Sequence, residues 1–299
     1  MEMKKIIDLV PFEPRKNYDL AHIYDISILI KTLEREDHLI QLLYSIQKFN
    51  FNGPIFIGDD SKINYKDRVI SLFPNLNIEY LILPYDTGTA VGRNLMLDKV
   101  KTPYFLLCDD DFVFDKRSRL PLMKKLLEKY DLDLLGGVFI QYDRKTRIGF
   151  YLKKLNLFFL KFGFVLPAFQ IYEYYSSFSI SDRKISFYKN EYFNPVTLCD
   201  LTHNFFLART DKVKIANGWN PVLKGGEHQN FFIRAKLAGL KVGTTNFCGV
   251  LHDQWTPNST NYQSLRNRGD FYKKLALNEF GIDEVIGYKE ALGEDFYSK

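Results

Sequence analysis

The sequence predicts an α/β protein with a mostly parallel central sheet flanked by helices. Short apolar segments alternate with segments in which apolar residues recur every three or four positions, as strands do with helices. Three of the early strands end in polar or acidic clusters, at residues 32–37, 59–60 and 109–111. In such sheets, ligands collect at the carboxyl ends of the strands. The 299 residues suffice for one large domain or two small ones, with a substantial core.

The first half of the chain carries the clearest alternation. Strands are expected over 25–31, 54–58, 78–83, 102–109 and 134–140, and helices over 38–49, 65–73, 88–100 and 118–130. The helix from His38, for example, places Leu39, Leu42 and Ile46 on one face. The connections are short, as in a doubly wound sheet.

The alternation stops after residue 140. Residues 141–200 are aromatic and basic, and 150–169 has two interpretations: extended segments that cover the open side of the sheet, or a cationic amphipathic surface that contacts lipid. Regular patterns then return. A strand is expected over 201–209, a short helix from Thr210, a helix from Glu227 to about Leu240, sheet segments over 242–251 and a helical tail from Thr260.

Composition narrows the class of protein. The net charge of +5 suits anionic substrates such as nucleotides, or acidic lipid headgroups, and lacks the basic runs of a nucleic-acid binder. Three separated cysteines in apolar contexts indicate buried thiols of a reducing compartment. No apolar run approaches the roughly 20 residues of a membrane span, and none near the N-terminus suits a signal peptide. We therefore expect a cytoplasmic protein, or one at the inner face of a membrane.

Known nucleotide motifs are absent from the sequence. It contains neither GxGxxG nor GxxxxGK[ST], which counts against a dinucleotide-binding protein and against a P-loop NTPase.

Asp109, Asp110 and Asp111 end an apolar strand abruptly. In an extended chain Asp109 and Asp111 share one side and Asp110 faces the other. Adjacent carboxylates beside a buried strand need a neutralising partner, and a hard divalent cation with oxygen ligands is the candidate. The alternative is an acidic turn that caps the next helix.

Two later features complete the pattern. Gly225-Gly226 forms a turn before Glu227-His228 at a helix start, and His252 follows the last strand. Glu227 could also be a plain cap favoured by the helix dipole. A sugar-nucleotide substrate suits the whole set. A cation would neutralise the leaving diphosphate, a separate carboxylate would deprotonate the acceptor hydroxyl, and a neutral histidine would complete the metal shell.

The chain resembles inverting glycosyltransferases of the GT-A fold, in particular the β-N-acetylgalactosaminyltransferases of ganglioside-type glycans and bacterial family-2-like enzymes. The segments that carry this resemblance are LPYDTG at 83–88 with GRN at 92–94, YFLLCDDDF at 104–112, NFFLART at 204–210, and GEH at 226–228 followed by Phe231-Phe232. They occur in the family's order and spacing over about residues 25–255.

The resemblance implies a role for individual residues. Nucleotide contacts are implied for Thr32, Arg35, Asp59, Asp60, Arg93, Asp109 and Asp110; metal contacts for Asp111, Asp109 and His252; and acceptor contacts for Trp219, His228 and Gly226. The triple aspartate is then the DXD element, and the cofactor is Mn²⁺ or Mg²⁺. Glu227 is the implied catalytic base. His228 is the alternative, because many relatives carry Glu-Asp where this chain has Glu227-His228, and in them the Asp is the base.

The implied reaction moves GalNAc, Gal, Glc or GlcNAc from a UDP-sugar to a hydroxyl of a glycan or lipid-linked acceptor, with inversion. The implied partners are the donor and the acceptor; the charge pattern counts against nucleic acid, and the segment at 150–169 leaves a peripheral membrane contact open. The implied organisation is a lead-in at 1–24, a catalytic domain at 25–255 and a helical extension at 256–299. Within the domain, 25–140 would bind the nucleotide and 141–255, with its aromatic insertion, the acceptor.

Two alternatives to this function remain. A metal-dependent nucleotidyl or phosphoryl transferase could use the same acidic cluster, but it would need a basic phosphate-binding loop that is not found near the N-terminus. A non-catalytic glycan-binding module of the same fold would bind a donor without turnover.

Overall fold

The computed structural model describes residues 23–142, 169–172, 176–191, 193–253 and 268–287. The strands are β1 (Ile26–Thr32), β2 (Ile55–Asp59), β3 (Ile78–Ile82), β4 (Tyr104–Asp109), β5 (Phe112–Val113), β6 (Leu134–Tyr142), β7 (Phe169–Tyr172), β8 (Ser177–Ser181), β9 (Lys184–Tyr188), β10 (Thr197–Cys199), β11 (Phe206–Arg209), β12 (Val242–His252) and β13 (Glu284–Ile286). The helices are α2 (Glu36–Lys48), α3 (Lys66–Leu72), α4 (Thr89–Lys99), α5 (Leu120–Lys129), α7 (Thr210–Ile215), α8 (Glu227–Leu237) and α10 (Gly269–Asn278).

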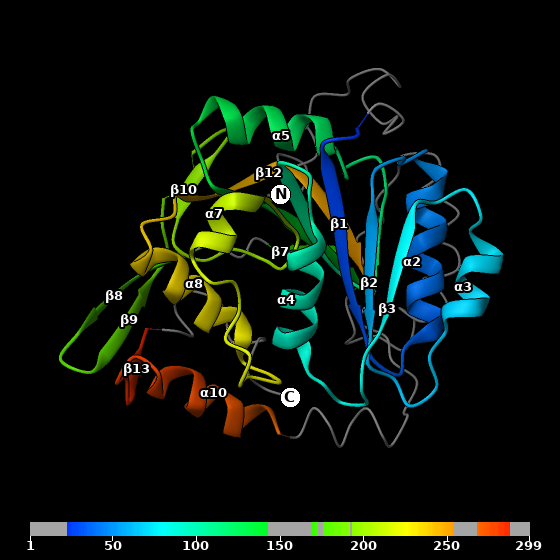
Figure 1. Ribbon diagram of the computed structural model, residues 1–299. Helices are drawn as coiled ribbons and strands as arrows, with labels where there is room; N and C mark the ends of the chain where they lie inside the picture. The colour runs from blue at the N-terminus through cyan, green and yellow to red at the C-terminus, as the bar shows by residue number, and fades with distance from the viewer. Residues whose placement is uncertain (1–22, 143–168, 173–175, 192, 254–267, 288–299) are drawn as a thin grey trace.

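A ten-stranded sheet forms the centre of the molecule, in the order β10-β12-β6-β11-β4-β1-β2-β3, with β5 on β12 and β7 on β6. β1 runs parallel to β2 and β4, β2 to β3, and β6 to β12, whereas β11 lies antiparallel between β4 and β6. The α/β class with a mostly parallel sheet is thus confirmed (Figure 1). Because Lys31 pairs with Asp109 and Thr32 with Asp59, the carboxyl ends of β1, β2 and β4 meet at one edge.

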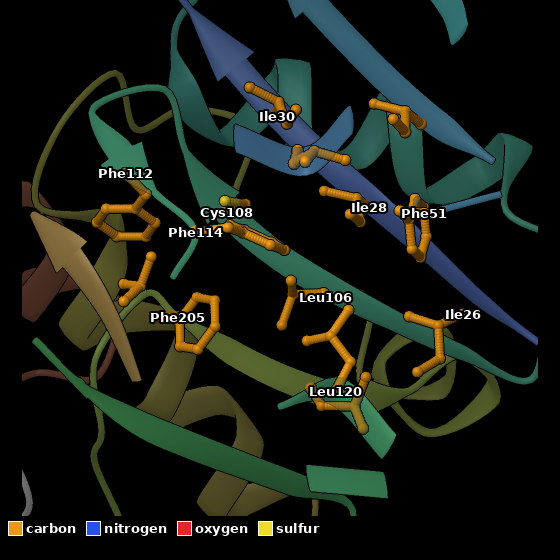
Figure 2. Close-up of a cluster of buried hydrophobic side chains, with 14 of the residues drawn as sticks. Ile26, Ile28, Ile30, Phe51, Leu106, Cys108, Phe112, Phe114, Leu120 and Phe205 are labelled. Carbon is orange, nitrogen blue, oxygen red and sulfur yellow. The ribbon is translucent and has the colours of Figure 1, made fainter. Parts of the chain in front are cut away.

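Helices cover both faces of the sheet, so its strands are apolar on both sides. On one face α2, α3 and α5 pack with Ile26, Ile28 and Ile30 of β1, and Figure 2 shows these side chains beside Leu106 and Cys108 of β4. On the other face α4, α7 and α8 pack with Leu29 of β1 and with side chains of β4 and β11. All three cysteines are free and buried, as predicted.

The second half differs from the predicted elements in two ways. The expected strand over 201–209 begins only at Phe206, because Leu201 forms just an isolated bridge to Ser176 and residues 202–205 are irregular. β8 and β9 form a hairpin that, with β13, makes a separate three-stranded sheet extending from the body (Figure 1). The segment at 150–168 and the lead-in at 1–22 lie outside the described residues.

The C-terminal helix α10 packs against α8. Asn230 donates to Glu279 Oε2 (2.6 Å) and to the Ala276 carbonyl (3.0 Å), and Arg234 Nη1 lies 2.9 Å from Glu279 Oε1. The helix in the predicted tail is therefore present within the described part, from Gly269. No described helix is both long and apolar enough to cross a membrane.

Candidate active site

The acidic cluster lies where the chain turns at the end of β4. The strand stops at Asp109, and the chain turns through Asp110 and Asp111 before β5. Arg35 therefore reaches both turn residues, with Nη1 3.2 Å from Asp110 Oδ1 and Nη2 2.6 Å from Asp111 Oδ2. Thr32 Oγ1 donates to Asp110 Oδ2 at 2.8 Å. The expectation that Asp109 and Asp111 share one side is wrong, because the chain is not extended here.

The two turn carboxylates are buried and differ in their pKa. Burial raises the pKa of Asp110 to about 7; the nearby Asp111 adds to this rise, while Arg35 opposes it. Burial alone would also raise the pKa of Asp111, but the charges of His252 and Arg35 outweigh it and hold that pKa below the usual range. The electrostatics of the cluster thus depend on its basic neighbours.

Asp111 and His252 fit a divalent cation. His252 ends β12, and its Nε2 lies 3.3 Å from Asp111 Oδ2. Asp111 Oδ1 is buried and has no hydrogen-bond partner among the described residues. No group of three or more potential ligands is gathered within the described ranges. Two protein ligands are nevertheless common for cations that also bind substrate phosphates.

Asp109 makes other contacts. Its Oδ1 accepts from Arg93 Nη2 (2.9 Å), and its Oδ2 accepts from the amide of Asn204 (3.1 Å). Both oxygens of Asp109 thus accept from protein donors, whereas Asp111 Oδ1 has no donor among the described residues. Asp111 is therefore the better candidate for a metal ligand.

Arg93 on α4 joins the two sides of the site. Its side chain is 2% exposed, and its guanidinium binds Asp109 through Nη2 and Glu227 Oε1 through Nη1 (3.0 Å). Glu227, the first residue of α8, has no further partner for Oε2 among the described residues. One oxygen of Glu227 is therefore held by Arg93, and the other has no protein donor within the described part of the chain.

Trp219 does not lie where the prediction placed it. It is 1% exposed, stacks on Phe231 (4.7 Å between ring centroids) and lies beneath Arg93 at 5.6 Å. Its ring supports the guanidinium and has no free face for an acceptor. The predicted acceptor contact of Trp219 is therefore wrong, because the aromatic ring belongs to the core beneath the site.

His228 lies beside Asn204. Its Nδ1 is 2.5 Å from Asn204 Oδ1, and Asn204 in turn binds Asp109. Burial, together with the charge of Arg93, lowers the pKa of His228 to about 3. Its imidazole is therefore neutral near pH 7. The role of Asn204 in linking this histidine to the acidic cluster was missed from the sequence, although the residue is part of the family segment at 204–210.

The acidic residues after β2 organise the neighbouring loops. Asp59 accepts from the amides of Ser61 (2.9 Å) and Tyr65 (3.2 Å) and from the Tyr80 hydroxyl (2.6 Å). Asp60 accepts from the Gly88 amide (2.9 Å) and pairs with Lys31.

Lys31 was also missed from the sequence. Burial lowers its pKa against the opposing effect of Asp60. A lysine next to the last residue of an otherwise apolar strand was the available signal.

Gly226 contributes through its backbone. It adopts the left-handed conformation (φ +68°), and a Cβ here would lie 3.1 Å from backbone atoms of Lys273 in α10. The glycine thus lets α8 begin close to α10, which places Glu227 beside Arg93.

Comparison with known proteins shows the family of the chain. The chain matches the profile of Glycosyl transferase family 2 over residues 27–187. It is 33% identical to human Beta-1,4 N-acetylgalactosaminyltransferase 1 over 233 residues, which is 77% of this chain and 40% of the human protein. It is 29% identical to mouse Beta-1,4 N-acetylgalactosaminyltransferase 2 over 270 residues, 89% of this chain and 46% of that protein. The chain thus spans less than half the length of these curated relatives.

Solved structures share the fold. S. aureus TarS 1–349 in complex with UDP-GlcNAc superposes with a TM-score of 0.55 at 15% identity, over 86% of this chain and 71% of that one. The mannosyltransferase PcManGT from Pyrobaculum calidifontis, in complex with GDP-Man and Mn²⁺, gives 0.56 at 10% identity, over 93% and 70%. At these identities the likeness concerns the architecture alone.

Proposed function

The chain belongs to glycosyl transferase family 2, and on that basis we propose that it is an inverting glycosyltransferase that uses a UDP-sugar. The observation that carries this proposal is Arg93, which binds Asp109 on the donor side and Glu227 on the other. The names of the curated relatives favour N-acetylgalactosamine as the sugar, and Gal, Glc and GlcNAc complete the set of candidates. The acceptor is a hydroxyl of a glycan or of a lipid-linked glycan.

The donor side is proposed at the joined ends of β1, β2 and β4. Thr32, Arg35, Asp60 and Asp110 gather there and would bind the nucleotide. Asp59 holds the adjoining loop through its hydrogen bonds, which supports a structural contribution to the same subsite. Polar groups at a strand-end crevice are the usual nucleotide environment in such sheets.

Asp111 and His252 would hold Mn²⁺ or Mg²⁺. Such a cation, when bound, neutralises the charge that develops on the departing diphosphate. The unpartnered Asp111 Oδ1 supports this assignment, because a buried carboxylate oxygen without a donor is costly.

Glu227 is proposed as the base. Its Oε2 would accept the proton of the acceptor hydroxyl while Arg93 holds Oε1. The hydroxyl oxygen then bonds to the anomeric carbon from the face opposite UDP, the bond from that carbon to the diphosphate oxygen breaks, and the configuration inverts once. His228 is the weaker candidate, because a pKa of about 3 makes its imidazole a poor proton acceptor.

A panel of UDP-GalNAc, UDP-GlcNAc, UDP-Gal and UDP-Glc, each with Mn²⁺ or Mg²⁺, tests the function without a known acceptor. We expect slow cation-dependent release of UDP from at least one donor. UDP binding without release from any donor would instead indicate a non-catalytic module. A transfer product with retained anomeric configuration would overturn the single displacement.

Two variants test the assigned roles in the same assay. Glu227→Gln should bind UDP normally and release UDP from the donor roughly 10²–10⁴-fold more slowly, the usual contribution of a general base. Weakened UDP binding in this variant would mark Glu227 as a donor contact. Asp111→Asn should lose the cation-dependent release of UDP, and full activity of this variant would refute the metal assignment. His228→Asn serves as the control that separates the two candidate bases.

A further inference from the structure

Three charged residues from distant parts of the chain meet beside the candidate site. Asp86 lies in the loop after β3, Lys224 in the turn before α8, and Arg268 directly before α10. Arg268 binds both carboxylate oxygens of Asp86, at 2.8 and 2.7 Å, and Lys224 Nζ lies 3.1 Å from Asp86 Oδ2. A two-point guanidinium contact fixes direction as well as distance. The hydrogen bond from Arg268 also lowers the pKa of Asp86.

Asp86 connects this group to the donor side. Its amide donates to the Asp60 carbonyl (3.1 Å), and two residues later the Gly88 amide donates to the Asp60 carboxylate (2.9 Å). The loop at 84–88 is therefore attached to Asp60, which is proposed to bind the nucleotide.

Lys224 connects the same group to the base side. A Cβ on Gly88 would lie 3.1 Å from the Lys224 Cα, so the turn packs directly on the loop. Gly226 follows against the backbone of α10, and Glu227 comes next. In Figure 1, α10 lies next to α8 on the side where this turn begins. The turn is thus enclosed between the nucleotide-side loop and the C-terminal helix.

We propose that Asp86, Lys224 and Arg268 form an ionic clamp that holds the turn carrying Glu227 against the nucleotide-side loop. In this role Arg268 and Asp86 are positioning residues, which set the distance from the base to the donor without touching either substrate. The inference rests on the proposed function, because it takes Glu227 as the base. It assigns a task to the C-terminal extension, whose helix lies outside the nucleotide- and acceptor-binding halves.

Arg268→Gln tests the clamp, and Arg234→Gln is its matched control. Arg234 of α8 pairs with Glu279, the residue after α10, and also donates to the Asn217 carbonyl. We expect kcat to fall about ten-fold in Arg268→Gln, since small misplacement of a catalytic group is costly. Arg234→Gln should stay within about two-fold of wild type, because the hydrogen bonds of Arg234 go to Glu279 and to the Asn217 carbonyl and not to the loop at 84–88. Arg268→Lys keeps the charge but loses the two-point contact, so its kcat should lie between those of Arg268→Gln and Arg234→Gln.

A double variant and a measurement independent of activity complete the test. Asp86→Asn keeps a residue that tolerates the positive φ of +54° at this position. Combined with Arg268→Gln it should cost no more than Asp86→Asn alone, because Asp86→Asn already removes the carboxylate that Arg268 binds. Amide hydrogen exchange over residues 86–88 and 224–227 should accelerate in Arg268→Gln and not in Arg234→Gln.

The outcomes separate the clamp from the proposed function. Equal losses of kcat in Arg268→Gln and Arg234→Gln, or unchanged exchange in Arg268→Gln, would overturn the clamp. If the wild type releases UDP from no donor, the proposed function fails, and hydrogen exchange still decides whether the clamp holds the turn.

Discussion

Arg93 shows how single residues of this site depend on their neighbours. A buried guanidinium is costly unless it is paired, and here Asp109, Glu227 and the ring of Trp219 surround it. Removal of either carboxylate would leave a buried charge with less compensation, which commonly costs several kcal/mol. The same arrangement fixes the distance between the donor side and the base, so the stability of this group and the proposed mechanism rest on the same contacts.

His228 gives a pH-dependent prediction for stability. Its pKa is about 3 in the folded protein, against an ordinary value near 6.5. Between these values the unfolded chain binds a proton that the folded protein does not, so the free energy of unfolding falls as pH falls. The loss begins below about pH 6.5 and amounts to about 1.4 kcal/mol per pH unit. Above pH 6.5 both states are neutral and His228 contributes no pH dependence.

Urea unfolding of wild type and His228→Asn at pH 7.5 and 5.5 measures this effect. The wild type should lose about 1.4 kcal/mol more than the variant between the two pH values, because other titrating groups cancel in the comparison. Equal losses would show that the imidazole is not held neutral.

The individual site residues were predictable from the sequence to different degrees. The aspartates after β2 and β4 were found because they end apolar strands, which is a local pattern. Lys31 and Asn204 were not assigned, because their importance comes from partners far along the chain. Trp219 was misplaced, because an aromatic residue beside a glycine turn does not reveal which side of the backbone its ring covers.

At the scale of elements, the local sequence pattern predicted strands and helices best in the first half of the chain. Strands buried on both faces give continuous apolar runs, and helices on one face give three-and-four spacing, so β1 to β4 and their helices fall close to the predicted bounds. The β8–β9 hairpin was not predicted. Its turn places Asp182 and Arg183 at positive φ, which normally calls for Asn-Gly, so the usual sequence signal is missing.

The two glycines that flank α8 provide a prediction about how closely the start of this helix packs against α10. Gly226 and Gly239 both have positive φ, but a Cβ at Gly239 meets nothing within 4 Å, whereas one at Gly226 meets the backbone of Lys273. Gly239→Ala should therefore cost only the left-handed strain of about 1 kcal/mol. Gly226→Ala should cost at least about 2 kcal/mol, since α10 must also move. Urea titration of the two variants measures these losses in the free energy of unfolding. Equal losses would mean that α10 is not tightly packed on this turn.

The two binding halves that the sequence suggests on either side of residue 140 share one sheet. β11 of the second half lies between β4 and β6 of the first half in one sheet. The candidate site likewise takes Asp109 from one half, and Glu227 and His252 from the other. Such pairing joins segments about 100 residues apart, and no local pattern reports it. The two halves are thus not separate folding units, although their roles in substrate binding remain a prediction.

This interleaving predicts that both halves unfold together. Leu207 of β11 is fully buried and faces Leu106 of β4 and Leu135 of β6, so Leu207→Ala should cost about 2–5 kcal/mol. Hydrogen exchange along a urea gradient gives separate midpoints for peptides from β1–β3 and from α8. In the wild type these midpoints should coincide, and in Leu207→Ala both should decrease by the same amount. If the β1–β3 peptides kept their wild-type midpoint in the variant, the first half would be folding on its own, and the single interleaved sheet would not control the stability of the nucleotide-side strands.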